Sequence, residues 1–451
     1  MSMNDYLIKR PVSKVFFHYL IPAICATMVT SIYVLADTII IGKFLGSTAM
    51  AALNIVLPVF NAFFGIGLLF GVGGSVLMSV FRGGGDFENA NRYFTAALIL
   101  NIAVCILLLI FSVVFMEDIA VFLGATEETK PYIMDYLPYI VWGIGAFFMS
   151  SFLQTFVRND GAPRLAMAAV IAGGVTNIIL DIVFVSPLGM GMSGAALATV
   201  IGTSLTVLIL IAHFFTKKNG LRLNFKGIKP AHLKNITVSG FASFLIEITE
   251  GIVILIFNAQ LLKYIGNVGV TVYGIISNTV IVVMCLTKGV SQAAQPVISN
   301  NYGAGLIDRA KKAQSLAVKT AAIICGAVSL IGLIAPNLFT CIFLNPDAQI
   351  LSMAPTAIRI YFVSMIFLGI NMVYISYFQS VISPGKSLLI CMARGFVLSV
   401  LFVEILPLFM GELGIWLAMP LTEIITSVII VFLVRGEKLS YAEPKERLED
   451  D

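Results

Sequence analysis

The chain has 451 residues, of which 59% are apolar and only 12% carry a charge. A soluble globular domain carries about 25% charged residues, so this composition excludes an ordinary soluble protein and indicates a polytopic membrane protein. The formal net charge is only +4, and a nucleic-acid-binding domain would need a basic soluble face. We therefore expect no nucleic-acid partner.

The polar N-terminal stretch MSMNDYLIKRPVSK precedes a full-length apolar segment that has no small-residue cleavage site behind it. This pattern predicts no secretory signal peptide. About 20 apolar residues cross a bilayer, and on this length the chain divides into twelve predicted transmembrane helices. In chain order they comprise residues 15–41, 49–80, 93–116, 132–157, 164–186, 193–215, 234–262, 269–299, 314–340, 355–382, 387–410 and 414–434.

The placement of lysine and arginine predicts the orientation of these helices. Most of the 28 basic residues fall on one side if both termini are cytoplasmic. The opposite side then holds only Lys43, Lys130, Lys263 and Arg359, while Lys288 lies within a span. We expect a multi-pass protein of the plasma membrane, the inner membrane of a bacterium, with both termini inside and the lipid bilayer as its surroundings.

A basic cytoplasmic linker at residues 216–233 divides the chain into two six-helix bundles, residues 1–215 and 234–434, followed by a charged tail at 435–451. The two bundles repeat each other at a constant offset: Gly83, Gly85 and Ala90 correspond to Gly303, Gly305 and Ala310. Because each bundle crosses the membrane an even number of times, we expect pseudo-two-fold symmetry about the membrane normal. Paired repeats of this kind are a common transporter design.

Intramembrane polar residues cluster at one depth in the N-terminal bundle. Counting about 1.5 Å per helical residue, Asp37, Asp181 and Thr199 all lie one to two turns from the outer surface, and Asn177 shares a helix face with Asp181 at the i, i+4 spacing. Tyr136 and Tyr139 enter at the same level. An intramembrane aspartate costs about 2.5–3.5 kcal/mol on insertion scales. These oxygen ligands suit Na⁺, and the two carboxylates can equally share a proton; the alternative is that each residue serves helix packing or that Asp37 extends to the interface.

The C-terminal bundle differs, because Phe257 stands where the repeat would place an aspartate. There Glu247 and Lys288 lie within about one turn of the same depth, which predicts an ion pair that could equally be a fixed structural contact. Glu250 is then the freer carboxylate and the better candidate to meet a cationic substrate. Two further acidic residues have no evident partner or role and stay unassigned: Glu404 and Glu423.

Four stretches resemble the multidrug and toxic compound extrusion (MATE) family, especially its bacterial members. They are TIIIGKFLG after Asp37, NIILD at 177–181, GAALAT at 194–199 and KGVSQAAQPVISNNYGAG at 288–305. The resemblance implies an all-α membrane protein of two bundles that exports cationic amphiphilic drugs in exchange for H⁺ or Na⁺, with no other cofactor. It also implies a cation site at Asp37, Asn177, Asp181 and Thr199.

The resemblance is less complete in the second bundle. Gly240 and Glu250 keep the spacing of a glutamate motif that some members use, but Ala242 replaces the usual proline and a helix 10 aspartate has no counterpart. We therefore place the coupling ion in the N-terminal bundle. Candidate contacts for small organic cations are Tyr136, Tyr139, Glu247, Glu250 and Lys288, in a protein expected to act as a monomer.

Two other function classes remain to be weighed. A flippase for lipid-linked precursors, known in the wider superfamily, should favour a cationic cavity, whereas Lys288 is the only basic residue placed well inside a predicted span. An enzyme is not expected, because the sequence has no histidine metal constellation, nucleophile elbow or phosphate loop.

Overall fold

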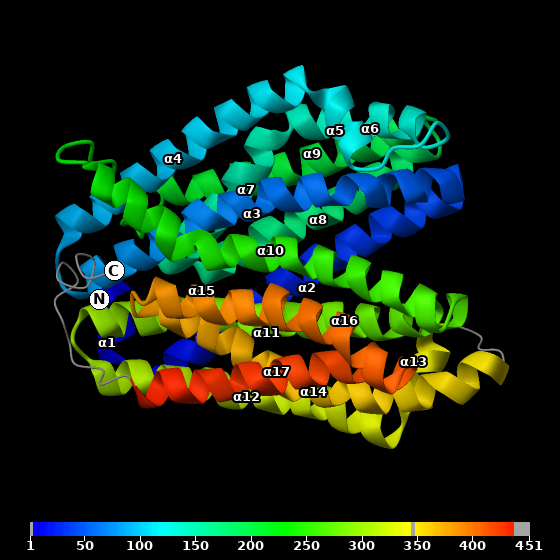
Figure 1. Ribbon diagram of the computed structural model, residues 1–451. Coiled ribbons are helices and arrows are strands. Elements are labelled where there is room, and N and C mark those ends of the chain that lie inside the picture. The colour runs from blue at the N-terminus through cyan, green and yellow to red at the C-terminus, as the bar shows by residue number, and fades with distance from the viewer. Residues whose placement is uncertain (1–2, 344–347, 437–451) are drawn as a thin grey trace. The chain divides into compact units, whose positions relative to one another are not determined.

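The computed structural model describes residues 3–343 and 348–436, and all regular secondary structure in these residues is helical (Figure 1). The first half contains α1 (Met3–Lys9), α2 (Val12–Leu45), α3 (Ser47–Gly83), α4 (Phe87–Val114), α5 (Met116–Phe122), α6 (Lys130–Trp142), α7 (Ile144–Asn159), α8 (Pro163–Val185), α9 (Gly191–Ile211) and the 3₁₀ turn η1 (Ala212–Phe215). The second half contains α10 (Pro230–Tyr264), α11 (Asn267–Gly303), α12 (Ile307–Ile334), α13 (Pro336–Phe343), α14 (Ala348–Ser380), α15 (Pro384–Met392), the π-helical segment η2 (Ala393–Val397), α16 (Leu398–Met410) and α17 (Glu412–Arg435).

The number of membrane-spanning helices agrees with the sequence. In the described residues, 11 helical stretches are long and apolar enough to cross a membrane, and the bent pair α6 and α7 would make twelve. The span expected at 132–157 is this pair, which bends by 53°. Helices satisfy their own backbone hydrogen bonds, which is why apolar segments adopt them in lipid. The predicted all-α membrane fold is confirmed.

The chain forms two compact units that are not divided at the basic linker. Unit 1 comprises Met1–Lys9 and Ile21–Glu247, and unit 2 comprises Arg10–Leu20 with the described part of Ile248–Asp451. Of the three boundaries, the one after Lys9 follows α1, while those after Leu20 and after Glu247 fall inside the long helices α2 and α10. The bundle boundaries expected at 216–233 stay a prediction.

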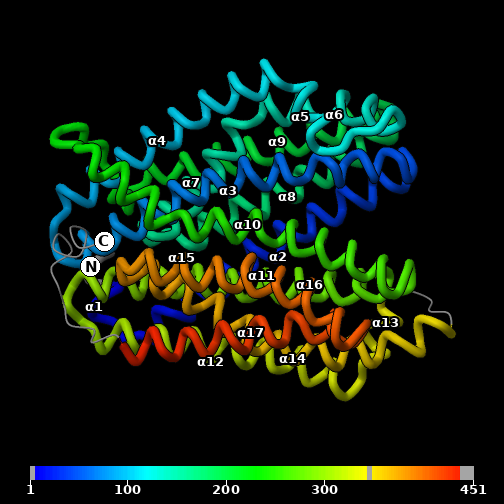
Figure 2. The backbone as a smooth tube through the Cα atoms, viewed as in Figure 1, coloured from blue at the N-terminus to red at the C-terminus, as the bar shows by residue number. Residues whose placement is uncertain are grey.

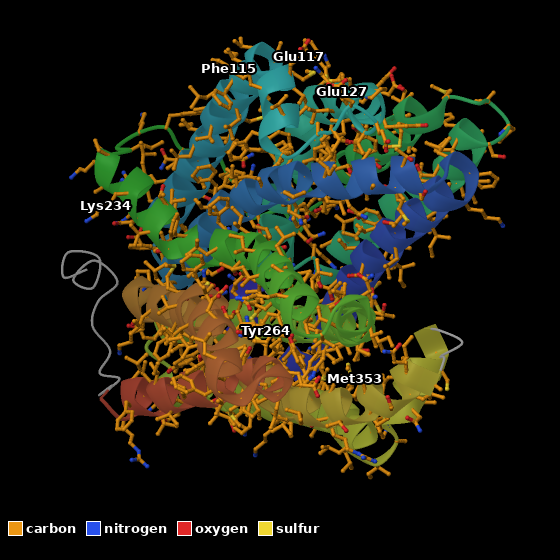
Figure 3. The ribbon with its side chains drawn as sticks, turned by 45° about the vertical axis from the view of Figure 1, so that its right-hand side comes forward. Phe115, Glu117, Glu127, Lys234, Tyr264 and Met353 are labelled. Atoms are coloured by element: carbon orange, nitrogen blue, oxygen red, sulfur yellow. The ribbon has the colours of Figure 1, made fainter. Side chains whose placement is uncertain are left out.

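Helix α7 is the centre of unit 1, because it packs against α3, α4, α8 and α9. Four phenylalanines of α7 are completely buried: Phe147, Phe148, Phe152 and Phe156. Figure 2 shows α4 running along the same bundle, and its side chains Ile106, Leu107 and Ile110 are exposed, as expected for a helix that faces lipid. Glu117 and Glu127 lie near each other and far from Lys234 at the start of α10 (Figure 3).

The buried carboxylate of Asp160 binds the segment that connects the two halves of the chain, and so holds this segment against unit 1. Asp160, at the end of α7, pairs with Arg82 of α3, lies 2.7 Å from Nε2 of His213, and accepts a 2.8 Å hydrogen bond from the backbone N–H of Gly220. The N–H of Asn224 then donates to Oγ1 of Thr95 on α4 at 2.8 Å. Residues 220–224 therefore belong to the packed structure of unit 1.

Unit 2 is arranged around α14, which packs against α11, α12, α15 and α17. Its buried side chains include Tyr361, Phe362, Met365 and Phe378. The segment η2 joins α15 to α16 with π-helical geometry. Short π-helical turns inside α-helices occur frequently at functional sites.

Candidate functional site

Two adjacent glycines of α8 allow α2 and α9 to approach it closely. A Cβ on Gly173 would lie 2.5 Å from the carbonyl oxygen of Gly202 and 2.0 Å from Oγ1 of Thr206, both on α9. A Cβ on Gly174 would lie 3.2 Å from Cδ1 of Tyr33 on α2. Small residues at such positions bring membrane helices into backbone contact, so these glycines set where the three helices meet.

The predicted polar residues lie directly beyond these glycines. Asn177, one turn after Gly173, donates from Nδ2 to Oγ1 of Thr199 at 3.2 Å. Asp181, one further turn along α8, is 0% exposed, and Asp37 of α2 is 7% exposed. The structure therefore brings together the four residues that the sequence grouped by depth.

No basic side chain among the described residues pairs with the carboxylates of this cluster. Both oxygens of Asp181, Oδ1 of Asp37 and Oδ1 of Asn177 are buried without a hydrogen-bond partner among the described residues. Asp37 and Asp181 are close enough to interact electrostatically with each other and with the hydroxyl of Tyr136. A buried, unpaired charge costs several kcal/mol, so this cluster is suited to bind a proton or a metal cation.

Of the two tyrosines expected at this depth, only one belongs to the cluster. Tyr136 is 4% exposed, whereas Tyr139 is 38% exposed. The sequence interpretation missed Tyr33, which interacts with Asp37. Its position one helical turn before Asp37 was the available signal, because i and i+4 share a helix face.

A cavity in unit 1 adjoins the carboxylate cluster. Aromatic and polar side chains line it, among them Tyr33, Phe60, Phe64, Phe147, Asn177 and Thr199. The rings of Phe60 and Phe147 meet edge to face, with centroids 5.0 Å apart. Aromatic faces beside buried carboxylates attract organic cations.

The charged residues of α10 and α11 differ from the expected arrangement. Nζ of Lys288 lies 3.0 Å from Oε1 of Glu250, so the expectation that Glu250 is the freer carboxylate is wrong. Glu247 belongs to unit 1, where its Cβ would be 3.4 Å from a Cβ added to Gly65. One helical turn therefore carries these two glutamates into different surroundings.

Glu423 has a partner that the sequence interpretation missed. It is 0% exposed and accepts a 2.7 Å hydrogen bond from Nε of Arg394 and a 2.8 Å bond from Nδ2 of Asn371. Arg394 lies inside the span Pro384–Met410, so Lys288 is not the only basic residue well inside a span. Glu404 is exposed and accepts a hydrogen bond from Nε2 of Gln260.

The position in unit 2 that corresponds to Asp37 is part of an aromatic cluster. Phe257 stacks on Tyr273, with centroids 5.0 Å apart, and meets the ring of Tyr361 at 6.3 Å. The buried carboxylate of Glu423 is neutralised by Arg394, in contrast to Asp37 and Asp181.

Comparison with known proteins gives matches over nearly the whole chain. The profile of the MatE family matches residues 22–183 and 238–405. The multidrug export protein MepA of Staphylococcus aureus is 27% identical over 439 residues, which are 95% of this chain and 96% of that protein. The outward-facing structure of a multidrug resistance MATE family transporter of the MOP superfamily is 24% identical, with a TM-score of 0.88 over 97% of this chain and 98% of the other.

A MOP superfamily transporter from Pyrococcus furiosus, described as having a binding pocket of reverse polarity, gives the same identity, TM-score and coverage. At a sequence identity of 24%, the structural likeness to these transporters shows the fold alone.

Proposed function

Because the chain belongs to the MatE family, a family of transporters and not of enzymes, we propose that it exports small organic cations by alternating access, driven by entry of H⁺ or Na⁺. The observation that carries this proposal is the pair of buried carboxylates, Asp37 and Asp181, without a basic partner among the described residues. The name of the staphylococcal relative, a multidrug export protein, supports drugs as the exported compounds.

The coupling follows from competition for the negative charge of this cluster. When Asp37 and Asp181 are ionised, the cluster attracts an organic cation into the adjoining aromatic cavity. A proton or Na⁺ that binds the carboxylates removes this attraction, and the drug is released. Binding of the coupling ion lowers the affinity for the drug, and binding of the drug lowers the affinity for the coupling ion by the same factor. Exchange of the two in opposite directions requires this negative coupling.

Each residue of the cluster has a separate task in this proposal. Asp37 and Asp181 bind the coupling ion. Thr199 fixes the amide of Asn177 through the 3.2 Å hydrogen bond, which leaves Oδ1 of Asn177 as a neutral oxygen ligand. Tyr136 of α6 interacts electrostatically with both carboxylates.

The proposed test is efflux of a fluorescent organic cation from proteoliposomes, with a Na⁺ gradient and a pH gradient imposed separately. We expect one gradient to drive efflux, and Asp181→Asn or Asp37→Asn to abolish it while the protein still inserts. Asp135→Asn is the matched control, because Asp135 is an exposed carboxylate on α6, and it should transport normally. Normal efflux by both Asp37→Asn and Asp181→Asn would refute the proposal.

Flippase activity toward lipid-linked precursors is the alternative function. Arg394 adds a basic residue inside a span, but Glu423 neutralises it, so no net positive charge favours a pyrophosphate there. The same proteoliposomes separate the two functions, because a flippase would move a lipid-linked precursor with neither gradient driving cation efflux.

We also propose that both termini lie on the cytoplasmic side of a bacterial plasma membrane. Support comes from the positive-inside rule and from the separation of Lys234 from Glu117 and Glu127 within unit 1 (Figure 3). Protease access to a C-terminal tag in right-side-out and inverted vesicles tests this orientation. Cleavage only in inverted vesicles is the expected result.

A further inference from the structure

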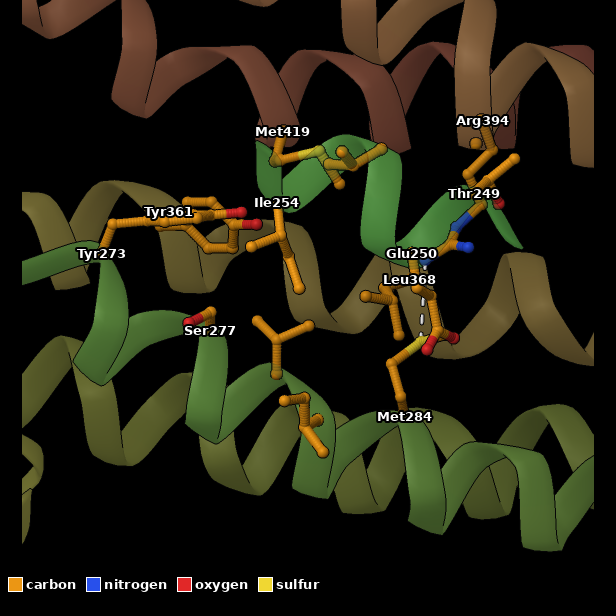
Figure 4. Close-up of a pocket in the computed structure, with 14 residues that line it drawn as sticks. Thr249, Glu250, Ile254, Tyr273, Ser277, Met284, Tyr361, Leu368, Arg394 and Met419 are labelled. Atoms are coloured by element: carbon orange, nitrogen blue, oxygen red, sulfur yellow. Dashed lines mark hydrogen bonds between the residues drawn. The ribbon is translucent and has the colours of Figure 1, made fainter. Parts of the chain in front are cut away.

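Unit 2 contains a cavity of its own, which the proposed export mechanism does not use. It is lined by residues of α10, α11, α14, η2 and α17 (Figure 4). Its lining includes the aliphatic side chains of Val253 and Ile254 of α10, Val280 and Ile281 of α11, and Leu368 of α14. A cavity that is mostly apolar with a few polar groups is the usual form of a small-molecule site.

Two opposite charges meet at one end of this cavity. Arg394 and Glu250 both line it. Figure 4 shows the guanidinium of Arg394 and the side chain of Glu250 beside Met284. The polar end of the cavity therefore offers a positive and a negative group together.

The guanidinium of Arg394 directs strong donors at weak acceptors. Its Nε donates to Glu423, whereas Nη1 donates to the sulfur of Met372 at 3.5 Å and Nη2 to the sulfur of Met284 at 3.8 Å. A thioether sulfur is a weak acceptor, and a guanidinium bonds a carboxylate much more strongly, with two parallel hydrogen bonds. A ligand carboxylate would replace the sulfur contacts with better ones.

The π-helical geometry of η2 fixes Arg394 at this place. Gly395 lies so close to α10 that an added Cβ would be 2.8 Å from Oγ1 of Thr249. Thr249 directly precedes Glu250, so this contact sets the two charged residues next to each other. Short π-helical turns of this kind are frequent at functional sites.

The opposite end of the cavity is aromatic. The rings of Tyr273 and Tyr361 have centroids 6.2 Å apart, and Figure 4 shows both hydroxyl groups directed toward Ile254. This end suits a flat or apolar body that carries a hydrogen-bonding group.

The charge balance of the cavity selects the class of ligand. Arg394 is neutralised by Glu423, and Glu250 by Lys288. A ligand with a net charge would introduce an uncompensated charge into a low-dielectric site, which is unfavourable. We propose that this cavity is a second binding site, for amphipathic zwitterions whose carboxylate binds Arg394, whose ammonium group binds Glu250, and whose apolar body reaches Tyr273 and Tyr361.

Ligand binding at this site can be measured by energy transfer from a single tryptophan. The chain has two tryptophans, and Trp416, one turn before the cavity residue Met419 on α17, is buried in unit 2. In full-length Trp142→Phe protein in nanodiscs, energy transfer from Trp416 to a dansyl group measures binding. Three matched probes share the dansyl body and the spacer: Nε-dansyl-lysine is the zwitterion, dansylcadaverine lacks the carboxylate, and N-dansyl-6-aminohexanoate lacks the ammonium group.

We expect Nε-dansyl-lysine to bind at least tenfold more tightly than either analogue. The double variant Arg394→Gln/Glu423→Gln removes both buried charges together, so it avoids an unpaired charge and should remove the advantage of the zwitterion over dansylcadaverine. Glu250→Gln should remove its advantage over N-dansyl-6-aminohexanoate. Tighter binding of dansylcadaverine than of the zwitterion in Asp181→Asn protein, whose cation site in unit 1 is disrupted, or full selectivity in the double variant, would overturn the proposal.

The inference stands apart from the proposed export function. Asp181→Asn lies in unit 1, so it should lose gradient-driven efflux of a cation and still transfer energy to Nε-dansyl-lysine. Loss of zwitterion binding in this variant would show that the binding site is not the cavity of unit 2. Intact cation efflux in it would contradict the export mechanism alone.

Discussion

Replacing Gly173 with alanine tests how the candidate cation site is held together. The new Cβ would lie 2.0 Å from Oγ1 of Thr206 and 2.5 Å from the carbonyl oxygen of Gly202. The hydroxyl of Thr206 cannot turn away without losing its hydrogen bonds to the carbonyls of Ala169 and Gly202, each 3.2 Å long. The carbonyl of Gly202 belongs to the backbone of α9 and cannot turn away from the added methyl group. Helices α8 and α9 must therefore separate.

The expected magnitude is a balance of two opposing effects. Overpacking costs about 1–3 kcal/mol, whereas alanine stabilises a helix by about 1 kcal/mol relative to glycine. Gly145→Ala on α7 is the matched control, because nothing lies within 4 Å of its added Cβ. The difference in unfolding free energy between the two variants should therefore equal the overpacking cost of about 1–3 kcal/mol.

The unfolding free energy of both variants can be measured in mixed micelles, and efflux in proteoliposomes. Gly173→Ala should also transport more slowly, because moving α8 from α9 lengthens the 3.2 Å bond between Asn177 and Thr199. Adding Thr206→Ala removes the closest contact but leaves the carbonyl of Gly202, so recovery should be partial. Equal stability of Gly173→Ala and Gly145→Ala would refute the view that backbone contact fixes this site.

Three further substitutions test individual contacts. Glu423→Gln leaves Arg394 without its counter-charge and should lower the unfolding free energy by about 3–5 kcal/mol; a loss below about 1 kcal/mol would contradict the buried pair. Thr199→Val removes the acceptor of the Asn177 amide and should destabilise by about 1–3 kcal/mol, while Thr199→Ser, which keeps the hydroxyl, should not, as thermal unfolding of the two variants can show. Asp86→Ala removes the side chain that caps α4 through a 3.0 Å hydrogen bond and should cost about 0.5–2 kcal/mol in the same measurement without changing efflux rates.

The helices were predictable because apolar length dictates them. Each of the twelve expected segments contains a long helix or, at 132–157, the bent pair α6 and α7. The bend falls at Gly143 and not at the nearby Pro138. Gly143 packs so closely on Val200 that an added Cβ would lie 2.5 Å from its Cγ2. That contact joins the end of α6 to α9, and its partner Val200 lies too far along the chain for the local sequence to predict it.

The depth of a residue along its helix was predictable, but the side of the helix to which its side chain points was not always predictable. The i, i+4 spacing placed Asn177 and Asp181 on one face, and the structure brings them to Thr199 and Asp37. The same counting put Tyr136 and Tyr139 at one level, although only Tyr136 is buried. Telling these two apart requires the packing of α6 against α9, which depends on residues distant in the sequence.

The charged pairs of the second half were the least predictable part. The π-helical segment η2 changes the rotation of the helix at Arg394, so counting 3.6 residues per turn misplaces this side chain. Glu250 and Lys288 lie on different helices, and a shift of one turn decides which glutamate the lysine meets.

The partners of Asp160 become available to it one after another as the chain is synthesised. A ribosome makes Arg82 long before Asp160, but His213 and Gly220 follow only later, and both bind the same carboxylate. While α8 and α9 are being inserted, Asp160 has Arg82 as its only partner of these three. These contacts of Asp160 are complete only once residue 220 has left the ribosome, so this connection can pack on unit 1 only after α9 has been made.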